Sequence, residues 1–173
     1  LAGSDPSRAR AMCIELADYL RRTLDERGTR LQPLARELAQ VRRYLNVEMV
    51  RYGDRLRVVE LVADDCLDQN VPPLILQPLV ENALKHGIAG LVEGGELRLG
   101  AERRGDRLTL WVENPVDPDG GRRGGSGIGL ANVRERLAKV FGDGARLRHG
   151  LSGDTYRAEV WLPLTGADGE AGG

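Results

Sequence analysis

The stretch that decides the fold is Leu76-Gln-Pro-Leu-Val-Glu-Asn-Ala-Leu-Lys-His-Gly87. At about 100° per residue, a helix here gathers its apolar residues on one side and its polar side chains within an arc of about 140° on the other. The polar set is Glu81, Asn82, Lys85 and His86. A carboxamide oxygen can bind Mg²⁺ and an ammonium group can neutralise phosphate oxygens, so this face suits a Mg²⁺–phosphate group. An ordinary solvated face with an ion pair between Glu81 and Lys85 is the alternative.

A glycine-rich stretch, Gly124-Gly-Ser-Gly-Ile-Gly-Leu-Ala-Asn132, precedes a predicted amphipathic helix over 130–141. Glycines let a backbone approach phosphates closely, and the free N–H groups at a helix start attract anions. Asn132 stands where a Rossmann motif needs its third glycine, and the sequence has no Gly-Lys-Ser/Thr of a Walker loop. The stretch therefore predicts a phosphate-binding turn of another kind.

The remaining pattern predicts a sheet between and after these helices. Strands are expected over 56–62, 96–99 and 107–112, with two more within 145–162 and a helix over 72–88. Helices interleaved with a largely antiparallel sheet predict an α+β sandwich. The Gly- and Ala-rich residues 165–173 are expected to be a disordered tail.

Residues 5–52 predict a hairpin of two helices, each with one apolar stripe. The hairpin alone cannot bury both stripes. A second copy of the chain could cover them in a four-helix bundle, which we favour, or the hairpin could pack on its own C-terminal domain. The stripe of the second helix is Leu34, Leu38, Val41, Leu45 and Met49.

Composition excludes several classes of function. The formal net charge of the 173 residues is −1, which gives no general affinity for nucleic acid or anionic lipid. Cys13 and Cys66 cannot build a disulfide framework, as is typical of a reducing cytosol. No apolar run approaches the roughly 20 residues that span a bilayer, so any membrane crossing is expected upstream of Leu1.

The two motifs, in this order and separated by a strand hairpin, resemble the GHKL or Bergerat ATP-binding superfamily. Residues 72–88 resemble the N-box of LytS/AlgZ-type sensor histidine kinases, and 127–137 resemble their second glycine box. Residues 19–24, 36–45 and 51–56 resemble the stretch between that family's acceptor histidine and its ATPase domain. The resemblance covers about residues 14–164.

This resemblance implies a two-layer Bergerat α/β sandwich over 55–164, preceded over 1–54 by the C-terminal part of the dimerisation region. It also implies a homodimer through that region, a cognate response regulator of the LytTR type, and a cytoplasmic location below a membrane anchor. Neither His86 nor His149 has the Pro-His-Phe-type flanks of an acceptor. The chain is therefore expected to be a fragment that begins after its acceptor and does not phosphorylate itself.

Site roles follow from the same resemblance. Asn82 would hold Mg²⁺, and Glu81 would polarise the attacking group or orient the waters of the metal. Lys85 and His86 would face the phosphates of ATP. The lid is expected over 117–126, and Thr155 is expected near adenine. Backbone N–H groups toward the phosphates would come from the glycine box, namely Gly127, Ile128, Gly129 and Leu130.

Two positions depart from the superfamily pattern. Asn114 stands where the first glycine box has an Asp that accepts from the adenine amino group; a carboxamide oxygen can still accept. Pro78 replaces the basic glutamate of gyrase-like ATPases, which favours phosphotransfer over a hydrolytic clamp. Asn114 also motivates an alternative, a module that binds nucleotide weakly and acts by docking to a partner. An anti-sigma kinase is less compatible with the helices over 5–52.

Overall fold

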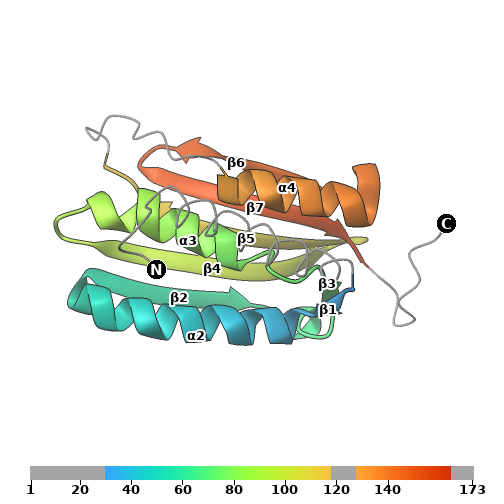
Figure 1. Cartoon of the computed structure of the whole chain (residues 1–173), viewed down its shortest axis with the longest axis horizontal. Helices are drawn as coiled ribbons and strands as arrows, with labels where there is room; N and C mark the ends of the chain where they lie inside the picture. The colour runs from blue at the N-terminus through green and yellow to red at the C-terminus, as the bar shows by residue number, and fades with distance from the viewer. Residues whose placement is uncertain (1–29, 118–127, 165–173) are drawn as a thin grey trace, which may run out of the picture.

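The computed structural model of the protein describes residues 30–117 and 128–164, and it forms two layers (Figure 1). One layer is a five-stranded sheet in the order β2-β4-β5-β7-β6, in which β2 and β4 are parallel and the other neighbours antiparallel. Its strands are β2 (Leu56–Val62), β4 (Gly95–Arg104), β5 (Arg107–Pro115), β6 (Arg146–Ser152) and β7 (Thr155–Pro163). The other layer is α2 (Leu34–Tyr52), α3 (Gln77–His86) and α4 (Ile128–Phe141), all on one face of the sheet. This confirms the predicted α+β sandwich.

Local patterning fixes most of the element bounds. Strand β2 has the predicted bounds, and the β4–β5 hairpin turns at Gly105, whose φ of 62° suits glycine. Helix α3 begins at Gln77 rather than at Pro72. Leu74 has φ 57°, a left-handed conformation that a helix cannot contain, so the segment before Gln77 is a turn.

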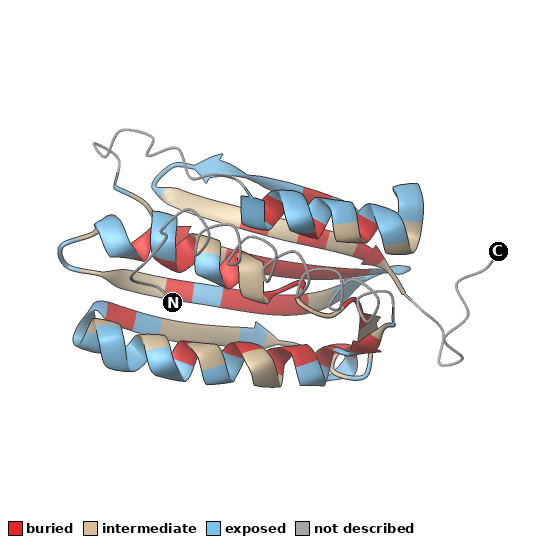
Figure 2. Ribbon diagram, in the orientation of Figure 1, coloured by how far each residue is buried: buried red, intermediate tan, exposed pale blue. Residues whose placement is uncertain are grey.

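The core lies between the sheet and the helices (Figure 2). Alternate residues of the central strands point into it and are almost fully buried, because successive strand residues face opposite sides. They are Leu97, Leu99 and Ala101 on β4, Leu108, Leu110 and Val112 on β5, and Ala158, Val160 and Leu162 on β7. Helix α3 contributes Leu79, Val80, Ala83 and Leu84 from its apolar side, as predicted.

Helix α2 packs into this same core. Its stripe from Leu34 to Leu45 is at most 3 % exposed, whereas Met49 at the end of the stripe is 37 % exposed. The first N–H groups of α2 are also tied to the domain, since Leu34 N donates to Gln69 O at 2.8 Å and Ala35 N to Leu67 O at 2.9 Å. The second predicted helix therefore packs against the C-terminal domain of its own chain. Helix α2 and the sheet share one core.

Two short strands, β1 (Gln32–Pro33) and β3 (Asn70–Val71), pair beside the start of α2 and were not predicted. The first predicted helix of the hairpin and the tail over 165–173 lie outside the described residues. No helix in the described ranges is long and apolar enough to cross a bilayer.

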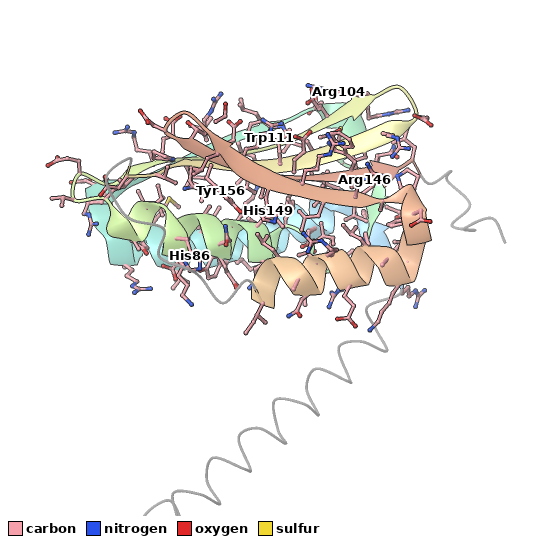
Figure 3. All side chains as sticks on the ribbon, turned by 90° about the horizontal axis from the view of Figure 1, so that it is seen from above. His86, Arg104, Trp111, Arg146, His149 and Tyr156 are labelled. Carbon is pink, nitrogen blue, oxygen red and sulfur yellow. The ribbon has the colours of Figure 1, made fainter. Side chains whose placement is uncertain are left out.

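The opposite face of the sheet carries charged and aromatic side chains. Arg157 lies over the Trp111 ring at 4.6 Å and donates to Glu113 at 2.7 Å. Figure 3 shows Trp111 on this side of the sheet and Tyr156 on the helix side. Neighbouring residues of β5 and β7 thus belong to two different environments, and the phase of each strand decides which residues can reach the helices.

Candidate functional site

Three polar side chains form a hydrogen-bonded series from α3 to the sheet. The Asn82 side chain bonds to Tyr156 of β7, and the Tyr156 hydroxyl lies 3.0 Å from Nδ1 of His149 on β6. Burial raises the pKa of Tyr156, and the bond to Asn82 opposes that shift. The phenol therefore stays neutral and can hold the Asn82 carboxamide in one orientation. Figure 3 places Tyr156 and His149 together between the sheet and the helices.

Asn114 ends the buried row of β5 beneath the end of α3. Its side chain is 2 % exposed, and its Nδ2 donates to Pro115 O at 2.8 Å. That bond fixes the amide orientation, because a carbonyl can only accept. Its Oδ1 is buried and has no hydrogen-bond partner among the described residues. A buried acceptor without a partner is costly, so this oxygen suits a ligand that carries an N–H donor.

Asn114 and Tyr156 are direct partners across β5 and β7, so both lie on the helix-covered face below Asn82. The structure therefore gathers Asn82, Asn114 and Tyr156 from three elements. Thr155, one residue before Tyr156, is in phase with Arg157 on the opposite face. Thr155, which is expected near adenine, thus faces away from Asn82, and Tyr156 is the residue of β7 that contacts Asn82. Thr155 borders a cavity of about 350 Å³ with Arg57, Gly95, Glu96, Arg98, Glu113, Asn114 and Pro115.

The polar arc of α3 divides between two sides of the helix. Asn82 reaches Tyr156, whereas Glu81 and Lys85 border a cavity of about 320 Å³ between α3 and α2. Glu81 accepts from Gln77 Nε2 at 2.8 Å, and no ion pair joins it to Lys85 in the described part of the chain. His86 is exposed at the end of α3. The remaining lining residues of this cavity are Tyr44, Glu48, Arg51, Tyr52, Leu84 and Ala89.

The start of α4 lies beside the start of α3. A Cβ built on Gly129 would stand 3.8 Å from Cβ of Pro78. Ile128 is 59 % exposed, whereas Leu130 is 7 % exposed and belongs to the core. Leu130 can thus offer a ligand only its backbone. Gly127 and residues 118–126 of the expected lid lie outside the described residues.

Comparison with known proteins agrees with this geometry. The profile of the histidine kinase family matches residues 1–56. Sensor histidine kinase BtsS of Escherichia coli K12 is 32 % identical over 160 residues, 92 % of this chain and 28 % of BtsS. Sensor histidine kinase/phosphatase LytS of Staphylococcus aureus is 31 % identical over 158 residues, 82 % of this chain and 26 % of LytS. The chain thus spans little more than a quarter of these relatives.

Solved structures extend the likeness to the fold. The catalytic domain of histidine kinase ThkA superposes with a TM-score of 0.57 at 15 % identity, covering 78 % of this chain and 96 % of that domain. Over most of its length the chain is thus similar in sequence to about a quarter of the sensor histidine kinases BtsS and LytS. Its described residues share the fold of the ThkA catalytic domain.

Tyr156, which contacts Asn82, and His149, which contacts Tyr156, were not predicted at the site. A usable signal was present, because Tyr156 alternates in phase with the apolar residues Ala158, Val160 and Leu162. His149 is exposed, as expected, but it lies on the helix side and contacts Tyr156.

Proposed function

We propose that this chain binds Mg·ATP between α3, β5 and β7 and serves as the catalytic part of a two-component sensor histidine kinase, which transfers the γ-phosphoryl group to a histidine side chain. The observation that carries the proposal is the unpartnered, buried Oδ1 of Asn114 on the same face as Asn82. An adenine amino group is a donor of the kind that this oxygen lacks.

The residues present fit the nucleotide. Asn114 would accept from the base, Asn82 would offer Mg²⁺ its carboxamide oxygen, and Tyr156 would orient Asn82. Mg²⁺ bridging phosphate oxygens neutralises charge that develops during phosphoryl transfer. The N–H groups at the start of α4, next to α3, would face phosphate oxygens, since helix N-termini favour anions.

Glu81 and Lys85 have a different place in the proposal. Both border the cavity on the α2 side of α3 rather than the Asn82–Tyr156 contact. Glu81 could therefore polarise an incoming histidine from that side, while Lys85 reaches around the helix end toward phosphate. The full-length kinase would dimerise and would phosphorylate a response regulator, for which we propose the LytTR type and a membrane-anchored parent.

Titration calorimetry with Mg·AMPPNP tests nucleotide binding. We expect a Kd in the micromolar to millimolar range, about −4 to −8 kcal/mol. Asn82→Ala should remove the Mg²⁺-dependent part, so that its residual affinity equals that of the wild-type protein in EDTA. Asn46→Ala, an exposed asparagine on α2, is the matched control and should bind as the wild type does. Binding that neither EDTA nor Asn82→Ala alters would favour a docking module in which Asn82 holds no metal.

A further inference from the structure

A carboxylate of α2 is buried against the segment that leads into α3. The Glu37 side chain is 0 % exposed. Its Oε1 accepts from the backbone N–H of Ile75 at 2.8 Å and of Leu76 at 3.0 Å. Its Oε2 accepts from Leu74 N at 3.0 Å and from Gln32 Nε2 at 2.9 Å. All four donors are neutral, and no cation pairs with this carboxylate in the described ranges.

These bonds stabilise residues 74–76, a segment that has few stabilising interactions of its own. Helix α3 has no side-chain cap of its own at Leu76, and Pro78 in its first turn has no N–H. Leu74 adopts φ 57°, which costs energy for a residue with a Cβ. A carboxylate at the start of a helix satisfies free N–H groups and interacts favourably with the helix dipole. Glu37, 39 residues before Leu76, therefore binds the backbone N–H groups of the turn that leads into α3, the N-cap residue Leu76 included.

The same segment is held from the other side. Arg136 of α4 donates through Nη1 to the carbonyl of Pro73. The turn before α3 is thus fixed by one side chain from each flanking helix, and α4 is the helix that follows the glycine box. Asn82 stands less than two helical turns after Leu76, so a displacement of the helix start moves Asn82 relative to Asn114 and Tyr156.

We propose that Glu37 is a positioning residue that sets the start of α3 and thereby the placement of Asn82. A movement of α2 would then displace Asn82 in the nucleotide site. This rests on the proposed nucleotide site. Helix α2 follows directly on the region that precedes the catalytic sandwich, and the histidine kinase profile runs through it to residue 56. A movement of α2 along its axis would be transmitted to the start of α3, and so to Asn82, by the hydrogen bonds of the two Glu37 carboxylate oxygens. Apolar contacts deform more easily and would transmit less of it.

The test uses Glu37→Gln, which keeps the volume but points an NH₂ group at backbone donors. Val41→Ala is the matched control, because it removes buried side-chain volume from the same helix one turn after Glu37 and leaves the Glu37 carboxylate in place. Both variants and the wild type are compared well below their unfolding temperatures. The first readout is the side-chain NH₂ resonance pair of Asn82 without nucleotide, and the second is the Kd for Mg·AMPPNP.

We expect Glu37→Gln to shift the Asn82 resonances and to raise the Kd about tenfold, while Val41→Ala changes it less than about twofold. If Glu37→Gln does not fold, Glu37→Asp, which withdraws the charge by one methylene, takes its place with the same expectation. Unmoved Asn82 resonances, or equal effects of Val41→Ala and Glu37→Gln on the Kd, would overturn the positioning role. Absence of binding by the wild type would instead count against the proposed function, and the Asn82 resonances would still decide the role of Glu37.

Discussion

The side-chain amide of Asn114 occupies the space that a Cβ on Gly87 would need. A Cβ built there lies 1.8 Å from Asn114 Nδ2 and 2.7 Å from Ala83 O. Glycine at the end of α3 therefore allows the helix to pass directly over the end of β5. This contact brings the last turn of α3 onto the residue that we assign to the base.

Gly87→Ala should accordingly displace Asn114 or lift the end of α3. We expect a loss of about 3 kcal/mol in the free energy of unfolding, as for an overpacked core site. Nucleotide binding should fall below detection. Gly90→Ala is the control, since a Cβ there meets nothing within 4 Å. Urea denaturation and calorimetry measure both effects; a Gly87→Ala protein as stable as Gly90→Ala would contradict this packing.

The Tyr156 hydroxyl should orient Asn82. Tyr156→Phe removes the bonds to Asn82 and His149 but keeps the ring. Loss of one such hydrogen bond costs about 1 kcal/mol, and we expect the Mg·AMPPNP Kd to rise about fivefold. Tyr52→Phe removes a hydroxyl outside this series and should leave the Kd unchanged. An unaltered Kd in Tyr156→Phe would mean that Asn82 is held by its helix alone.

Cys66 should give the domain an alkaline limit. Burial first, and then the neighbouring Asp65 carboxylate, raise the pKa of the Cys66 thiol to about 11 from an ordinary value of 9.0. Because the folded pKa lies above the unfolded one, the stabilisation is complete below about pH 9 and is lost as the pH rises through 11. At about 1.4 kcal/mol per pKa unit, the loss approaches 2 to 3 kcal/mol.

Urea denaturation at pH 8, 9 and 10 of the wild type and of Cys66→Ala measures the first half of this loss, about 1.4 kcal/mol by pH 10. The free energy of unfolding of the wild type should fall relative to that of Cys66→Ala as the pH rises, since the variant has no thiol to ionise. Tyr44, whose pKa burial raises to about 12, is common to both proteins and cancels in the difference. A pH-independent difference would show that Cys66 ionises as readily in the folded state.

The sequence pattern predicted those parts of the fold that depend on neighbouring residues in the chain. Strand β2 and the turn at Gly105 follow from alternation and from glycine, and the buried side of α3 follows from helical periodicity. The predicted start of α3 was wrong because two prolines suggest a first helical turn, whereas the segment before Gln77 is a turn whose N–H groups at residues 74–76 bind Glu37. Nothing in the sequence shows that the carboxylate of Glu37, within an apolar stripe, accepts from backbone N–H groups about 38 residues away.

The site was predictable only in part for a similar reason. Asn82, Asn114 and the glycine box stand out in the sequence, and the structure brings the two asparagines to one face. Thr155 was expected near adenine from its motif position, whereas the contact of Tyr156 with Asn82 was not predicted; a shift of one residue moves a strand side chain to the opposite face. The burial of α2 depends on packing across the whole domain, which periodicity along one helix does not show.

Discrimination between ATP and ITP tests the central claim most directly, because inosine has a carbonyl where adenine has its amino group. If Oδ1 of Asn114 accepts from that amino group, Mg·ATP should bind the wild type at least about tenfold more tightly than Mg·ITP, which would set two acceptors against each other. Asn114→Ala should weaken ATP binding and bring the two Kd values together. Equal affinities for ATP and ITP in the wild type, or a preference that survives Asn114→Ala, would contradict the assignment of Asn114 and the placement of the nucleotide on this face.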